Sequence, residues 1–198
     1  KTEQAEALIG KTAQLKFMLV NESTQAAKIQ EEISKLNKPA IDKDGNIAPE
    51  IKKILPPNLT ILKGKSDRET SDVKYYVLES KVEVTGAYLE NARVETDAQF
   101  GMPNIAFSFN KEGGKLFEEL TARNVERFLA IVLDDVVYTA PRIKTKITGG
   151  KGIIEGNFTM EEARDIALVL RSGALPAPVK IIEKRVVGPT LGQDSISK

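Results

Sequence analysis

Two short stretches of the chain contain the residue types that hold phosphate groups. Residues 64–66 read Gly-Lys-Ser, as at the end of a phosphate-binding loop, but the glycine that opens such a loop would fall at Leu59. Gly150 and Gly152 have the spacing that begins a dinucleotide-binding turn, but the third glycine would fall at Glu155. We therefore expect a hairpin turn at the glycines and no nucleotide site.

One acidic stretch has part of the spacing of a calcium loop. Asp42, Asp44 and Asn46 stand at alternate positions, as the first ligands of such a loop do. The glycine is misplaced at Gly45, and Lys53 stands where a bidentate glutamate should close the loop. We expect a solvated turn here and no metal site.

Two pairs of neighbouring carboxylates have the residue type needed for acid–base work. Asp134-Asp135 lies between two apolar runs, at a predicted hairpin tip, and Glu118-Glu119 lies on the face of a predicted helix. Both positions favour a solvated role. The chain has no cysteine and no histidine, which excludes thiolate nucleophiles, imidazole bases and zinc sites built on those residues. We therefore expect no catalytic residue, no cofactor and no enzyme.

Composition indicates a folded domain with a well-solvated surface. The hydrophobic fraction is 41%, and 29 basic residues are balanced by 28 acidic ones, for a net charge of +1. No basic run interleaved with aromatic residues marks a nucleic-acid surface. The longest apolar run, residues 128–133, is far shorter than the roughly 20 residues that cross a bilayer. The chain opens inside a predicted helix, so we interpret it as a soluble fragment cut from a longer protein.

The elements that must position these residues alternate between strand and helix periods. Ser23 or Thr24 should begin a helix, Asn110 should cap another, and Thr159 with Glu162 forms a capping box for a third. Strands are expected at 13–20, 60–62, 73–78, 82–84, 92–96, 104–109, 128–133, 136–139, 143–147, 153–154 and 179–187. Helices are expected at 1–9, 24–37, 49–55, 110–124 and 159–173. This order predicts an α+β fold with mixed or antiparallel sheets and helices packed on one side.

An apolar turn precedes one of the predicted strands. Phe100, Met102 and Pro103 make this turn a candidate contact point for a protein partner. The alternative is a loop tucked under the core. The residue pattern favours the tucked loop.

Several stretches resemble one protein family in ordered succession. They are LIGKTAQLKF at 8–17, NIAFSFNKEGGKL at 104–116, ITGGKGIIEGNFT at 147–159, EAR at 162–164, LRSGALPAP at 170–178 and VGPTLGQDSI at 187–196. These stretches resemble SecD, an export-accessory membrane protein that acts with SecF beside the bacterial SecYEG channel. The stretch from 21 to about 80 matches no pattern of the family that can be quoted.

The resemblance implies the first extracytoplasmic, periplasmic domain of a protein of the bacterial inner membrane. Its fold would be a ferredoxin-like base, here truncated to 1–20 and 175–198, with an inserted head at 21–174. The implied function is binding of the emerging unfolded polypeptide during export that depends on the proton-motive force. The alternative is a non-catalytic spacer that docks on partner membrane proteins. Candidate hinge residues lie where head and base meet: Val20, Asn21, Gly173, Leu175 and Pro176.

Overall fold

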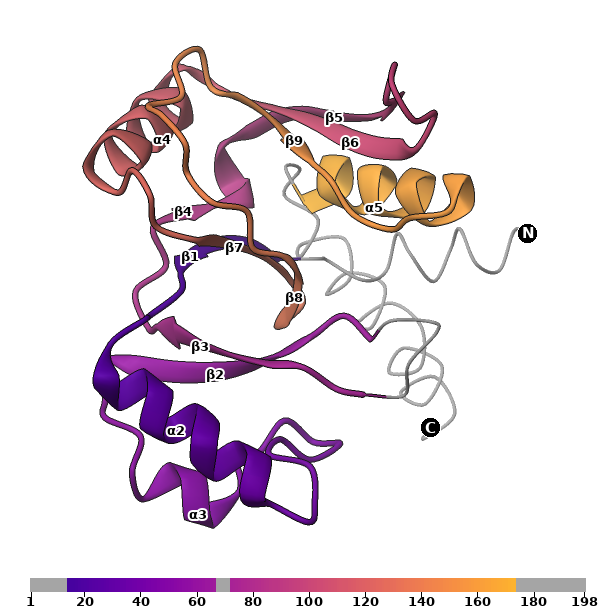
Figure 1. Cartoon of the computed structure of the whole chain (residues 1–198). Helices are drawn as coiled ribbons and strands as arrows, with labels where there is room; N and C mark the ends of the chain where they lie inside the picture. Colours follow the sequence, from indigo (N-terminus) through magenta and orange to yellow (C-terminus); the bar gives the residue numbers. More distant parts are fainter. Residues whose placement is uncertain (1–13, 67–71, 174–198) are drawn as a thin grey trace, which may run out of the picture.

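Two β-sheets and four α-helices make up the part of the chain that the computed structural model describes, residues 14–66 and 72–173 (Figure 1). The elements in chain order are β1 (Leu15–Leu19), α2 (Thr24–Lys35), α3 (Pro49–Lys52), β2 (Leu59–Gly64), β3 (Tyr75–Glu79), β4 (Val84–Thr85), the 3-10 turn η1 (Gly86–Tyr88), β5 (Leu89–Thr96), β6 (Pro103–Phe109), α4 (Lys111–Arg123), β7 (Leu129–Leu133), β8 (Val136–Thr139), β9 (Lys151–Ile154) and α5 (Met160–Gly173). The α+β class expected from the sequence is confirmed.

The larger sheet has six strands in the order β3-β2-β8-β7-β1-β4. Its neighbours pair antiparallel except for β2 and β8, which are parallel, so the sheet is mixed. The sheet curls until the end of β1 reaches β3, where Val20 bridges Leu78 and the Asn21 amide donates to the Val77 carbonyl at 2.9 Å. The smaller sheet is antiparallel, in the order β5-β6-β9.

The two central strands of the large sheet are apolar on both faces because both faces are buried. Phe17 of β1 and Ile131 of β7 face a core shared with the smaller sheet, α4 and α5. Met18 and Val132, the next residues along each strand, face a second core inside the curl of the large sheet. This explains why the apolar run in β7 does not alternate with polar residues.

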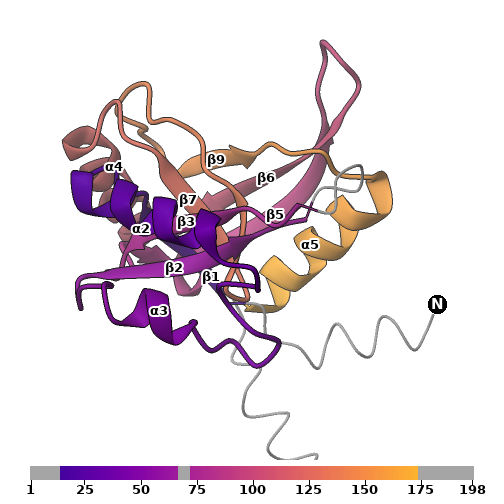
Figure 2. The same cartoon turned by 60° about the horizontal axis from the view of Figure 1, so that its bottom comes forward.

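The helices cover different faces of the molecule, so the expectation that they pack on one side is wrong (Figure 2). α2 and α3 pack on β2 and β3 through a third core that contains Ile29, Ile51 and Ile61. α4 and α5 instead line the core between the sheets, where α5 lies against β5 and β6. Each helix packs on the sheet face against which it can bury its own apolar stripe.

The local start signals act as predicted. Asn110 accepts a hydrogen bond from the Gly113 amide at 2.8 Å, and Thr159 and Glu162 exchange the two bonds of a capping box. Asp134 and Asp135 have φ values of 50° and 61° and form the two-residue turn between β7 and β8. That left-handed pair is the turn that matches the twist of a hairpin.

The strand expected at 143–147 is wrong. The segment is a loop. The Ile143 amide donates to the Arg127 carbonyl at 2.8 Å, the Ile143 carbonyl accepts from the Glu126 amide at 2.7 Å, and the Ile147 amide donates to Thr121 Oγ1 at 2.9 Å. As a result, Gly149 and Gly150, with φ of 82° and 65°, form a turn that leads into β9 but join no hairpin. The turn is confirmed, and its hairpin form is not.

The predicted division into base and head stays a prediction. Residues 1–13 and 174–198, with the helix at 1–9 and the strand at 179–187, lie outside the described residues. β1, assigned to the base, pairs along its length with β7, which was assigned to the head. β1 is therefore continuous with the sheet of the head.

Candidate functional site

The stretches that partly match nucleotide and metal loops are held by local contacts. Gly64 ends β2 beneath the Tyr76 ring, and the Lys65 ammonium lies 4.4 Å from the centroid of Phe158. The Asp42 carboxylate accepts hydrogen bonds from the Asn46 side chain and from the amides of Asn46 and Asp44, which lowers the pKa of that carboxyl. Within residues 14–66 and 72–173, no three Asp or Glu side chains gather as metal ligands would.

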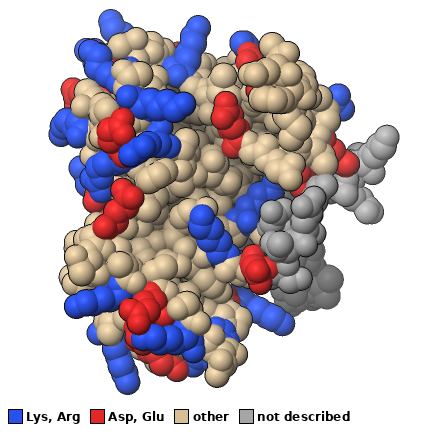
Figure 3. All heavy atoms as spheres, viewed as in Figure 1, with Lys and Arg blue, Asp and Glu red and all other residues tan. Residues whose placement is uncertain are grey.

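Charges of both signs are interspersed over the surface seen in Figure 3, so that face carries no field of a single sign. None of the described helices has the length and the apolar character that crossing a bilayer requires.

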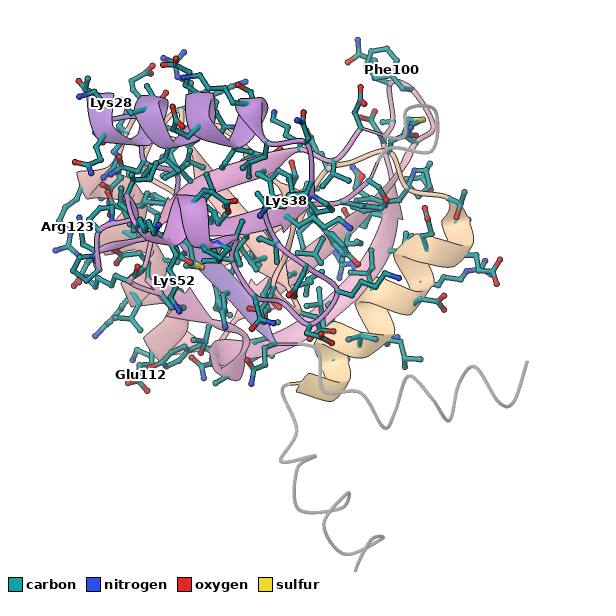
Figure 4. The ribbon with its side chains drawn as sticks, turned by 90° about the horizontal axis from the view of Figure 1, so that it is seen from below. Lys28, Lys38, Lys52, Phe100, Glu112 and Arg123 are labelled. Carbon is teal, nitrogen blue, oxygen red and sulfur yellow. The ribbon has the colours of Figure 1, made fainter. Side chains whose placement is uncertain are left out.

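The tip of the β5–β6 hairpin holds an apolar side chain in solvent. Phe100 is 74% exposed and Met102 43% exposed, and Figure 4 shows Phe100 at the end of the projecting loop. The alternative of a loop tucked under the core is therefore wrong. Pro103 begins β6, opposite Thr96, and is half-buried.

Hydrogen bonds within the loop fix this tip. The Asp97 carboxylate accepts from the Gln99 amide at 2.5 Å and from the Phe100 amide at 3.1 Å. The Asp97 amide donates to the Met102 carbonyl, and the Gly101 amide to the Asp97 carbonyl, each at 2.8 Å. Gly101 supplies the positive φ, 66°, that the turn needs. The exposed ring is therefore presented by a turn with four internal bonds.

A groove of about 500 Å³ lies between the first half of α2 and the outer edge of β3. Its walls are mostly apolar or small, and they are formed by Val20, Asn21, Glu22, Ser23, Ala26, Ala27, Gln30, Lys74, Tyr75, Tyr76, Val77, Phe128 and Ala140. The sequence did not reveal it, because its walls come from four separate segments. The only hint was the neighbouring Ala26 and Ala27, whose small side chains leave space beside the helix.

Two of the predicted hinge residues lie at the rim of this groove. The Val20 amide donates to the Phe128 carbonyl at 3.0 Å, and the Val20 carbonyl accepts from Arg127 Nη2 at 3.4 Å. Asn21 is bound to Val77 through its amide. Gly173 ends α5, and Leu175 and Pro176 lie outside the described residues. The hinge stays a prediction.

Arg127 joins three segments beside the rim. Its Nη2 lies 2.5 Å from Glu79 Oε1 at the end of β3, and its Nη1 donates to Asn124 Oδ1 at 3.1 Å. Both partners of the ion pair are about one-third exposed, so water partly screens the attraction. The guanidinium holds the end of β1, the end of β3 and the segment after α4 together.

The comparisons with known proteins agree with the resemblance. Residues 60–177 match the family model described as SecDF, P1 head subdomain. The protein translocase subunit SecD of Elusimicrobium minutum is 50% identical over 194 residues, covering 98% of this chain and 39% of that protein. SecD of Calditerrivibrio nitroreducens is 48% identical over 200 residues, covering 99% of this chain and 35% of that protein. This chain thus spans less than two-fifths of the length of either relative.

Two solved structures share the fold. SecDF in a super-membrane-facing form has a TM-score of 0.57 and 39% identity, with 89% of this chain and 21% of that chain covered. A SecDF structure described as a membrane component that enhances protein export has a TM-score of 0.56 and 39% identity, with 89% of this chain and 70% of that chain covered. The family model alone covers more than half of the chain. The chain therefore belongs to the SecD family and contains the P1 head subdomain of SecDF proteins.

Proposed function

We propose that this chain is the extracytoplasmic head, with part of the base, of a Sec translocase accessory subunit. In this role it binds the unfolded polypeptide that emerges from the SecYEG channel, and it works with SecF in export that depends on the proton-motive force. It binds and moves but carries out no chemical step. The family supports the assignment to protein translocation, and the binding role is argued from the surface of the head.

The observation that carries the proposal is the exposed Phe100 on a hydrogen-bonded turn. A large apolar side chain in water gains free energy when a partner covers it. The bonds to Asp97 hold the turn in place before a partner arrives, so less ordering entropy is lost on binding. An aromatic anchor without a shaped pocket suits a partner of varied sequence, as an exported chain is.

Crosslinking in living cells tests the proposal. A photoreactive residue is placed at Phe100 in the full-length protein, and the cells carry an exported chain stalled in the channel. The matched control is the same residue at Arg123, which is exposed and lies far from the tip in Figure 4. We expect crosslinks to the stalled chain from position 100 and few from position 123.

The spacer alternative predicts a different pattern. Crosslinks from position 100 that reach only partner membrane proteins would favour docking and contradict polypeptide binding. Replacing residues 21–174 with a short linker completes the test. Precursor accumulation with a stable shortened protein supports an active role for the head, and normal export contradicts it.

A further inference from the structure

Among the described residues, the outer edge of β3 is paired along only part of its length. β3 is the terminal strand of the large sheet and pairs with β2 along its length. On its other side, the end of β1 covers Leu78 and Val77 and then turns away into α2. In the described part of the chain, no strand continues along this edge beside Tyr75.

Backbone N–H and C=O groups point to alternate sides along β3, and this alternation shows which of them face the unpaired side. The Lys74 carbonyl accepts from the Gly64 amide at 2.7 Å, so the polar groups of Lys74 point toward β2. The Val77 carbonyl accepts from Asn21, so those of Val77 point away from β2. Because backbone groups alternate along a strand, the amide and carbonyl of Tyr75 point the same way as those of Val77. They face the groove.

The walls of the groove fit an extended backbone. Ala26 and Ala27 of α2 lie across from β3, and their small side chains leave room for a chain between helix and strand. The Tyr75 ring does not fill this space, because its side chain packs into the α2 core and its hydroxyl accepts from the Ala40 amide at 3.2 Å. The lining includes one acidic residue, Glu22, and one basic residue, Lys74, so the formal charge of the groove sums to zero. A groove of zero net charge suits a neutral peptide backbone better than an ion.

We propose that the open edge of β3 accepts an extended polypeptide segment by strand addition, in line with Val20 and Asn21, which already pair with the same edge. The segment rests between β3 and α2 and pairs with the amide and carbonyl of Tyr75. The uncovered residues from Lys74 to Tyr76 span about 10 Å at roughly 3.3 Å per residue, so about three residues of the segment are held. Backbone pairing reads no particular sequence, which suits an exported chain. The identity of the occupant rests on the proposed function, whereas the mode of binding does not.

The first test uses the whole chain and three synthetic decapeptides of one apolar sequence. One is unmodified, one is N-methylated at every second residue, and one is N-methylated at every residue. Methylation of alternate residues leaves one hydrogen-bonding edge intact, so that peptide should bind within about threefold of the unmodified one. Methylation of every residue removes the N–H that donates to the Tyr75 carbonyl and places methyl groups along both edges of the peptide. We therefore expect its binding to be weaker by at least about tenfold.

The second test fills the groove. Ala27→Trp places a large ring at an exposed position of α2 that lines the groove, and Lys28→Trp is the control on the next, exposed residue outside it. Circular dichroism and thermal unfolding establish that both variants fold. We expect Ala27→Trp to abolish binding of the unmodified peptide and Lys28→Trp to leave it unchanged.

Equal binding of the unmodified and fully methylated peptides would overturn strand addition while leaving polypeptide binding at the hairpin tip intact. Unchanged binding by Ala27→Trp would place the peptide elsewhere. A third outcome is that the parent chain self-associates and binds no peptide, and that Ala27→Trp abolishes the self-association. The occupant of the groove would then be a second copy of the chain, and the proposal would be overturned. Failure of the Phe100 crosslinks alone would contradict the proposed function and leave the peptide result standing.

Discussion

Gly152 of β9 lies directly opposite Phe107 of β6, and the Phe107 ring occupies the space that a side chain at Gly152 would need. A Cβ built on Gly152 would lie 2.8 Å from Phe107 Cε1. The ring packs among other aromatic side chains, with its centroid 5.7 Å from that of Phe17 and 5.4 Å from that of Phe109. The small sheet therefore depends on the absence of a side chain at this position.

Gly152→Ala should destabilise the protein by about 1–3 kcal/mol, because the added methyl overpacks a fixed aromatic cluster. Denaturant unfolding measures the change. Lys151→Ala is the control, since Lys151 is exposed on the same strand, and it should stay within about 0.5 kcal/mol of the parent. Equal stability of the two variants would show that the ring can move aside.

Phe100 and Phe107 should behave oppositely although both belong to the β5–β6 hairpin region. Phe100→Ser should change stability by no more than about 0.5 kcal/mol, because the ring is already in water. Phe107→Ala should cost about 3–5 kcal/mol, because it opens a cavity in the core. Thermal or denaturant unfolding of both variants checks the contrast. A large loss from Phe100→Ser would mean that the ring packs on the protein in solution.

Thr121→Val should destabilise the protein by about 1–3 kcal/mol. Thr121 is fully buried in α4, and its hydroxyl accepts from the Ile147 amide, which valine cannot do. Thr121→Ser keeps the hydroxyl and should retain slow hydrogen exchange at the Ile147 amide, whereas Thr121→Val should lose it. Slow exchange in both variants would indicate another acceptor for that amide.

Arg127→Met should release the end of β1. The loss of its bonds to Glu79 and Val20 should cost about 1 kcal/mol, a modest value because the pair is partly exposed. Hydrogen exchange should become faster at the Val20 and Asn21 amides. Arg142→Met removes a more exposed pair with Glu126 and serves as the control, with a change near zero. Unchanged exchange at Val20 would contradict the role given to Arg127.

Alkaline pH should destabilise the protein in part through Tyr138. Burial raises the pKa of this phenol above its ordinary value of 10.0, and the charges of Asp134 and Glu162 add to the effect. The folded state therefore holds the phenol proton more tightly than the unfolded state does. This contribution is complete below pH 10 and is lost as pH rises through the folded pKa.

Tyr138→Phe should lose less stability than the parent between about pH 10 and the higher folded pKa, since its ring has no proton to release. Denaturant unfolding over this pH range measures the difference between the two proteins. Parallel stability curves would show that the phenol titrates alike in the folded and unfolded states.

The sequence by itself determined the local structure wherever a signal is short-range. Asn110, Thr159 with Glu162, and Asp134-Asp135 act through backbone groups within four residues, so their caps and turn could be predicted without a tertiary structure. The quoted stretches likewise indicated the family that the comparisons show. The sequence identified Phe100 as a candidate contact residue but could not predict that its side chain is exposed. An apolar turn has the same sequence pattern whether it is buried or projects into solvent.

Only the tertiary structure decided what depends on segments far apart in the chain. The groove exists because α2, β3, Phe128 and Ala140 meet. Within residues 14–66 and 72–173, the edge of β3 beside Tyr75 is left unpaired because the chain turns away after Asn21. The loop at 143–147 has strand-like residues, yet its amides pair with Arg127 and Thr121 rather than with a strand. Periodicity records which residues prefer burial, whereas the choice of partner depends on the packing of the whole chain.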